Sequence, residues 1–206
     1  MDANLPTTSR GRRTRARIVD ATADLVFERG AAGTSLDDVC AATGTSKSQL
    51  FHYFPAGKKD LLAAVVNCQT ERVFDAQRPE LEKLDSWEAL RRWRDGVIAL
   101  QRQLHCAGGC PIGSMADELA EHDPHARSLL AESFATWQGY IEKGLATMRD
   151  CGKLRRDADP ATLALATMAA LQGGLLLTKT TRTTRPLEVA LDAALAHVRS
   201  YAVARG

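Results

Sequence analysis

Several motifs that mark enzymes are missing from this 206-residue sequence. It has no glycine-rich phosphate loop, no GxSxG nucleophile elbow and no paired catalytic residues on a strand-turn-helix frame. No stretch alternates polar and apolar residues as a half-buried strand would, and no Pro-, Ser- or Gly-rich linker separates independent domains. No signal peptide is recognisable. These absences argue against an enzyme and predict an all-α, cytoplasmic protein.

Cysteine is present, but its spacing does not define a metal site. Five is an odd number, and Cys106 and Cys110, with His105 beside them, form the only cluster. Thiolates and imidazole are good ligands for soft metals, so a thiol- or metal-responsive regulator using Cys106 and Cys110 remains an alternative. A small helical enzyme is a weaker alternative. We expect no cofactor and no bound metal, because the histidines lack HExxH-like spacing.

Positive charge is concentrated near the start of the chain. The formal net charge is only +2, yet five arginines fall close together without an acidic residue among them: Arg10, Arg12, Arg13, Arg15 and Arg17. Such a basic arm can lie along phosphates or enter a minor groove. The alternative is a solvated tail, which we expect at least for residues 1–9.

The next stretch predicts two short helices joined by a glycine turn. Ser35 is placed to cap the first helix, with Asp38 completing a capping box. Gly44 permits the turn, and Ser46 can cap the second helix. Leu50 and Phe51 are expected to face inward. The outward positions are Lys47, Ser48, Gln49 and His52, which carry hydrogen-bonding groups suited to base edges. An ordinary αα-hairpin with a solvated polar face is the alternative.

These residues resemble the TetR family of bacterial transcriptional regulators. The resemblance covers about a quarter of the chain and is carried by Thr14–Ala23, Phe27, Gly30, Thr34–Val39, Phe51–Pro55 and Lys58–Leu62. Phe54–Lys58 and Gly109–Gly113 are more similar to the LmrA and YxaF branch. The resemblance implies a homodimer with a three-helix N-terminal DNA-binding domain and a larger C-terminal domain that binds a small molecule. We place these domains at residues 1–57 and 58–206.

The same resemblance implies which residues contact double-stranded DNA. Bases or nearby phosphates would be contacted by Thr45, Ser46, Lys47, Ser48 and Gln49. The DNA backbone would mainly be held by Thr34, Ser35, His52, Tyr53 and Lys58. From the basic arm, we add Arg13 as a DNA-contacting residue.

Helical periodicity continues through the rest of the chain. The expected helices run from about residue 14 to 28, 58 to 77, 86 to 107, 114 to 120, from Pro124, and 161 to 177, followed by a final helix. The helix over residues 161–177 is apolar nearly all round, so a soluble protein must bury both its faces. Ala166, Ala170 and Gly174 lie four apart and would let another helix approach closely. We therefore expect the last two helices to form a four-helix dimer interface.

Two alternatives exist for the role of that apolar helix. It could be the centre of a monomer core, or it could span a membrane. Thr162, Thr167, Gln172 and the Gly173-Gly174 pair interrupt a run barely long enough to span, so no membrane association is expected.

An effector pocket is expected among apolar side chains with a few polar anchors. Such a lining suits small lipophilic or aromatic molecules. The candidates are Trp93, Met115, Phe134, Trp137, Gln138, Met168 and Gln172, although such stripes often form plain core. The function expected from all of these features is a repressor that binds a palindromic operator as a dimer and is released by its effector.

Overall fold

The computed structural model describes Pro6 and residues 8–203, and within these residues the chain is built from helices. Two short N-terminal helices follow a long one: α1 (Ser9–Arg29), α2 (Leu36–Thr43) and α3 (Lys47–Tyr53). The remaining elements are α4 (Lys58–Asp75), η1 (Glu80–Lys83), α5 (Trp87–Gln103), α6 (Pro111–Leu119), α7 (Pro124–Asp150), α8 (Pro160–Thr181) and α9 (Arg185–Arg199). The only β pairing in the described part is an isolated bridge between Leu154 and Ala202. The all-α prediction is confirmed.

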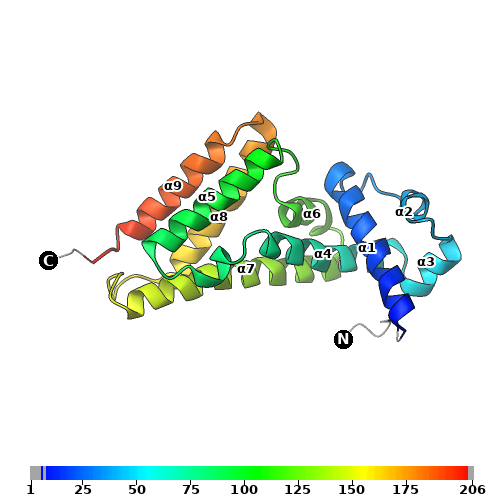
Figure 1. The fold of residues 1–206 in the computed structure, drawn as a ribbon, viewed down its shortest axis with the longest axis horizontal. Coiled ribbons are helices and arrows are strands. Elements are labelled where there is room, and N and C mark those ends of the chain that lie inside the picture. The colour runs from blue at the N-terminus through cyan, green and yellow to red at the C-terminus, as the bar shows by residue number, and fades with distance from the viewer. Residues whose placement is uncertain (1–5, 7, 204–206) are drawn as a thin grey trace. The chain divides into compact units, whose positions relative to one another are not determined.

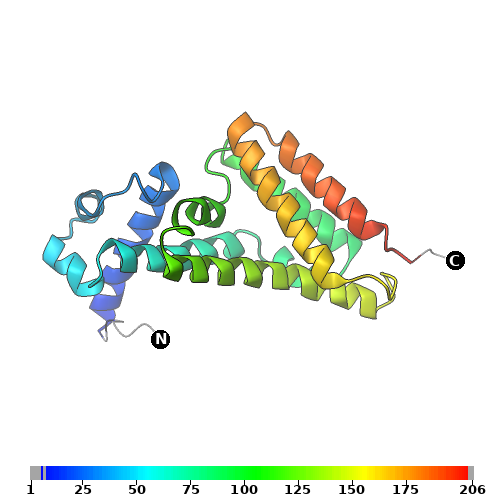
Figure 2. The same ribbon diagram turned by 180° about the vertical axis from the view of Figure 1, so that it is seen from behind.

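The chain forms two compact units. The N-terminal unit comprises the described residues of Met1–Arg72 and Pro111–Ser133, and the C-terminal unit those of Val73–Cys110 and Phe134–Gly206. In the C-terminal unit, α5, α8 and α9 lie side by side (Figures 1 and 2). The predicted boundary between residues 57 and 58 falls at the start of α4 and stays a prediction.

Local capping confirms the predicted helix starts. The Ser35 side chain accepts from the Asp38 backbone N–H while the Asp38 carboxylate accepts from the Ser35 N–H, so the capping box is complete. Gly44 ends α2 in the left-handed conformation, with φ of 60°. Ser46 caps α3 by accepting from the Gln49 N–H. These hydrogen bonds set where the two short helices begin and end.

The first helix begins earlier than the apolar pattern predicted. Thr8 caps α1 by accepting from the Gly11 N–H at 3.1 Å, so the helix starts at Ser9 rather than near Thr14. Arginine favours helices, and no acidic residue or proline interrupts this stretch. The expected tail is therefore wrong for Ser9, whereas residues 1–5 and 7 lie outside the described residues.

One inward-facing residue was also wrongly predicted. Leu50 is fully buried, but Phe51 is 45% exposed, and Phe54 at the end of α3 is the buried aromatic side chain instead. Consecutive residues of an α-helix point about 100° apart, and in α3 the direction of Phe51 lies away from the side on which Leu50 is buried.

Glycines allow two close helix contacts in the C-terminal unit. A Cβ at Gly174 of α8 would lie 3.0 Å from the Leu187 Cα of α9, so the helix that approaches there belongs to the same chain. A Cβ at Gly144 of α7 would lie 2.4 Å from the Leu84 carbonyl oxygen. These glycines fix how closely α9 and the segment after η1 pack.

Candidate nucleic-acid interface

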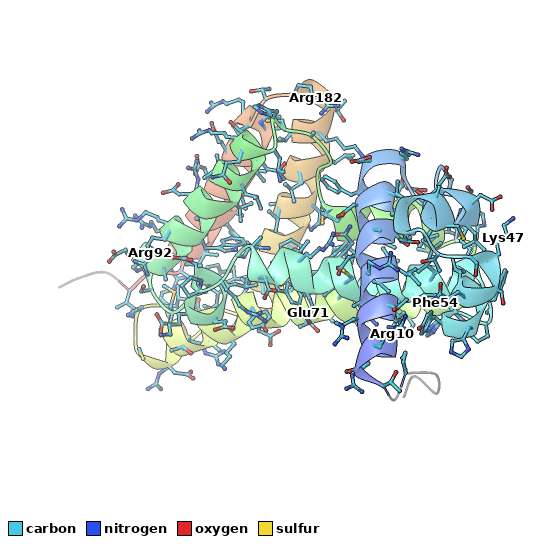
Figure 3. The ribbon with its side chains drawn as sticks, turned by 45° about the vertical axis from the view of Figure 1, so that its right-hand side comes forward. Arg10, Lys47, Phe54, Glu71, Arg92 and Arg182 are labelled. Carbon is cyan, nitrogen blue, oxygen red and sulfur yellow. The ribbon has the colours of Figure 1, made fainter. Side chains whose placement is uncertain are left out.

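Five of the eleven predicted DNA-contacting residues are exposed polar side chains on α3 or at its cap. Lys47 projects outward from this helix, whereas Phe54 lies beside α1 (Figure 3). Seven of the predicted residues are exposed: Arg13, Ser35, Ser46, Lys47, Ser48, Gln49 and His52. Tyr53 and Lys58 are half-buried. We call the exposed polar side chains of α3 and its cap the α3 face: Ser46, Lys47, Ser48, Gln49 and His52.

Two predicted contact residues have buried side chains. The Thr34 hydroxyl donates to the Gly30 carbonyl at 2.8 Å, and the Thr43 hydroxyl donates to that of Thr45 at 2.9 Å. Both Thr34 and Thr45 are at most 4% exposed. Any contact they make with DNA would use the backbone, and that role stays a prediction.

Lys47 is held by an acidic residue that the sequence analysis did not single out. Its Nζ lies 2.8 Å from Oδ1 of Asp37 on α2, and both side chains are largely exposed. The hydrogen bond that Lys47 donates to the Asp37 carboxylate raises the pKa of Lys47, so the ammonium remains charged at any physiological pH. On the same helix, hydrogen bonds from Ser35 lower the pKa of Asp38. An acidic side chain of α2 therefore lies directly beside the α3 face.

Two of the clustered arginines make contacts within the protein. Arg17 donates to the Thr43 carbonyl at the end of α2. The Arg15 guanidinium lies over the Phe54 ring, 5.1 Å from its centroid. These contacts fix α1 against the C-terminal ends of α2 and α3. Arg10 and Arg13 lie exposed at the start of α1, so the basic arm is the first part of a helix rather than an extended segment.

A second contact orders the connection between α1 and α2. Glu118 of α6 accepts from the backbone N–H of Ala32 at 2.8 Å. Gly30, which ends α1 with φ of 79°, lies so close that a Cβ there would be 2.7 Å from Oε1 of Glu118. Helix α6 is thereby bonded to the segment that leads into the DNA-contacting helices. Nothing in the local sequence indicated this contact, because 86 residues separate its partners.

The expected effector-binding residues are divided between the two units. Met115 is buried in the N-terminal unit, where it lines a small void with Val26, Phe27, Gln69 and Ser114. The other six candidates lie in the C-terminal unit: Trp93, Phe134, Trp137, Gln138, Met168 and Gln172.

Two of those six carry buried polar atoms without a partner. Among the described residues, Nε1 of Trp137 and Nε2 of Gln172 find no acceptor. By contrast, Nε1 of Trp93 donates to the Gln77 side chain at 2.8 Å. Buried polar groups are usually hydrogen-bonded, so an unpaired donor marks a position where a ligand oxygen would be favourable.

In the part of the chain that the structure describes, the cysteines do not form a metal site with other side chains. No group of three or more His, Cys, Asp and Glu side chains there could hold an ion. Cys106 and Cys110 are both buried thiols. Cys106 follows His105, and both have positive φ in the tight turn after α5.

Family models match both parts of the chain. The model described as "Bacterial regulatory proteins, tetR family" matches residues 18–65, and the one described as "Tetracyclin repressor-like, C-terminal domain" matches residues 86–194. The first match contains α2 and α3, and the second ends within α9.

Individual proteins are similar to this chain over most of their own length. An uncharacterised HTH-type transcriptional regulator in the lacX 3' region of Lactococcus lactis is 31% identical, covering 88% of this chain and 91% of that protein. The HTH-type transcriptional regulator LmrA of Bacillus subtilis, from the branch that the sequence predicted, is 27% identical over 84% of this chain and 90% of its own. A solved TetR-family regulator from Cytophaga hutchinsonii superposes with a TM-score of 0.83 at 20% identity, covering 97% of this chain and 100% of that one.

The apolar helix α8 is long and hydrophobic enough, by length and composition, to cross a membrane. It packs against α9, however, and core helices of soluble proteins have the same composition. The relatives described above are HTH-type transcriptional regulators. With its helix-turn-helix and its C-terminal helical domain, this chain belongs to the TetR family of DNA-binding transcriptional regulators.

Proposed function

We propose that this regulator is a cytoplasmic repressor that binds a palindromic operator as a homodimer and leaves it when a small lipophilic or aromatic effector binds. The observation that carries the proposal is the α3 face, which presents hydrogen-bonding side chains on a helix whose start is fixed by Ser46. Side chains of this kind read base edges in the major groove. Repression is favoured over activation because the C-terminal match is to a repressor-like domain.

Binding to a palindrome requires two copies of the α3 face. Two recognition helices about 34–36 Å apart enter successive major grooves on one side of the duplex. An exposed apolar surface on α8 and α9 supports dimerisation. Its large members are Leu165, Leu176, Leu177 and Val189, each about half exposed or more in the single chain. Leu165 and Leu176 are separated by about three helical turns and therefore share one side of α8.

Effector binding is supported by the unpaired donors of Trp137 and Gln172. Trp137 also meets the Phe74 ring edge-on, with centroids 6.1 Å apart, so the indole belongs to an aromatic cluster. A flat apolar molecule would pack against the rings, and an acceptor oxygen on it would satisfy the Trp137 donor. This combination favours an aromatic effector that carries a carbonyl, hydroxyl or ether oxygen.

Coupling to DNA would use the bond from α6 to the segment after α1. Since Glu118 accepts from Ala32, a movement of α6 would change the position of the α1–α2 connection. An effector can shift the operator-binding equilibrium only through its difference in affinity for the two states, and a few kcal/mol would suffice.

Selection of genomic fragments by the purified protein tests the proposal. The selection is run alone and with a panel of lipophilic and aromatic compounds. A palindromic site that one compound releases is the expected result. The control is a Lys47→Ala/Gln49→Ala variant, which keeps the fold but changes the α3 face. Failure to enrich any sequence, or equal enrichment by that variant, would contradict the assignment of the α3 face.

A further inference from the structure

A groove lies between α5 and α9 in the C-terminal unit, away from the proposed effector anchors on α7 and α8. Its volume is about 350 Å³, which is within the range of small-molecule sites. Figure 1 shows the two helices side by side. The lining residues are Trp87, Leu90, Arg91, Arg94, Asp95, Asp192, Leu195, Ala196 and Arg199.

Ion pairs between the two helices hold the groove in shape. Arg94 of α5 donates through Nη2 to Asp192 of α9 at 2.9 Å and through Nη1 to Asp95 at 2.8 Å. At a second place along the two helices, Nη2 of Arg102 on α5 donates to Glu188 of α9 at 2.7 Å. Since α5 and α9 are bonded at two places, the groove exists before any ligand enters. Preformed sites lose less freedom on binding.

The groove has a surplus of positive charge. Its three arginines and two aspartates leave one net positive charge. Both aspartates form ion pairs with Arg94. Neither Arg91 nor Arg199 has a carboxylate partner among the described residues. These two guanidiniums are therefore available to an anion from outside the chain.

The apolar part of the groove is flat and lies next to that charge. The Arg199 guanidinium sits over the Trp87 ring, 5.0 Å from its centroid. Leu90 and Leu195 provide aliphatic walls. Stacking on an indole orients the guanidinium plane, and an oriented guanidinium binds a carboxylate through two parallel hydrogen bonds.

We propose that this groove binds a small aromatic carboxylate, with its ring against Trp87 and the leucines and its carboxylate on Arg91 and Arg199. The site is distinct from the proposed effector site, because its lining does not include Trp137 or Gln172. Its lining comes from α5 and α9 and contains none of the exposed leucines of α8, Leu165, Leu176 and Leu177, that make up most of the proposed dimer surface. Val189 of α9 lies beside the groove, three residues from Asp192 and seven from Ala196.

Fluorine NMR of the full chain labelled with 5-fluorotryptophan tests the site directly. The three tryptophans give one reporter in the groove, Trp87, and two buried reporters elsewhere, Trp93 and Trp137. Single Trp→Phe variants assign the resonances. The probe is 2-naphthoate, and 2-naphthamide is the neutral probe of the same shape. Saturable movement of the Trp87 resonance by naphthoate, with at least about tenfold weaker binding of the amide, is expected.

Charge variants complete the test. Arg91→Gln/Arg199→Gln should weaken naphthoate binding at Trp87 by at least about tenfold. Arg92→Gln is the matched control, since Arg92 is the neighbouring arginine on α5, pairs with Glu88 and does not line the groove. The proposal is overturned by a Trp87 resonance that does not move, by equal binding of the amide, or by equal losses in both variants. Movement of the Trp137 resonance alone would overturn it too, while supporting the proposed effector site.

Discussion

Lys47 on the α3 face is bonded to Asp37 of the preceding helix, with Nζ and Oδ1 2.8 Å apart. A lysine that approaches DNA in this state brings a carboxylate with it. Binding to a phosphate or base would therefore replace one partner of Lys47 with another, and the carboxylate would repel the backbone. Asp37 thus opposes binding to any DNA that does not offer Lys47 a good alternative partner.

Removing the Asp37 carboxylate should strengthen binding to scrambled DNA more than binding to the operator. Asp37→Asn should raise affinity for scrambled DNA a few-fold and affinity for the operator less, so the ratio of the two falls. Lys47→Ala should lower operator affinity by about tenfold to a hundredfold if Lys47 contacts a base. Fluorescence anisotropy at two salt concentrations measures both variants. A normal operator affinity in Lys47→Ala would remove Lys47 from the contact surface.

Tyr53, at the end of α3, tests a sequence-independent contact. Its ring meets that of His52 edge-on with centroids 5.1 Å apart, and phenylalanine can keep this packing. Tyr53→Phe removes only the hydroxyl. If that hydroxyl donates to a phosphate, affinity should fall about twofold to tenfold for operator and scrambled DNA alike. A loss confined to the operator would instead indicate a base contact.

Glu118 tests the coupling between α6 and the DNA-binding helices. Glu118→Ala removes the acceptor for the Ala32 N–H, which should cost about 0.5–1.5 kcal/mol of stability and reduce the effect of an effector on operator affinity. Glu118→Gln keeps an acceptor oxygen and is the matched control. The measurement is operator affinity with and without effector. An unchanged ratio in the alanine variant would place the coupling elsewhere.

Short-range features of the fold were predictable from the sequence. Ser35 and Ser46 cap helices as predicted, because a cap and its partner lie within three residues of each other. The stripe along α7 was also predictable, since Trp137, Ile141 and Leu145 recur at helical spacing and are buried. Periodicity and capping depend on neighbours along the chain, which a sequence displays directly.

Long-range contacts were not predictable. Arg17 and Thr43 are 26 residues apart, so nothing in the arginine cluster distinguished Arg17 from its exposed neighbours. The pairing of Asp37 with Lys47 was not predictable either, because the geometry of the turn between α2 and α3 decides whether these two side chains meet. For the candidate site, the helix that carries the α3 face was predictable. Which of the predicted contact residues are buried, such as Thr45 just before that helix, depended on packing with other parts of the chain.

Gly144 gives a test of packing in the C-terminal unit. A Cβ there would lie 2.4 Å from the Leu84 carbonyl and 2.7 Å from the Leu84 Cβ, so Gly144→Ala must displace backbone. We expect a loss of about 1–3 kcal/mol in unfolding free energy. Gly139 on the same helix has open space around it, and Gly139→Ala should be neutral or stabilising by up to about 1 kcal/mol. Urea denaturation measures both, and equal effects would contradict the close contact.

The apolar surface of α8 and α9 tests the proposed dimer. Leu165 and Leu176 are 58% and 62% exposed in the single chain, and burying such side chains contributes about 1.5–3 kcal/mol each. Leu165→Glu/Leu176→Glu would place two charges on each side of a two-fold interface, so light scattering after gel filtration should give the monomer mass. Val203→Glu, at an exposed apolar residue outside both helices, is the control and should remain dimeric. A dimer in the double variant would move the interface to another surface, whereas a monomer in the unaltered protein at micromolar concentration would contradict dimerisation itself.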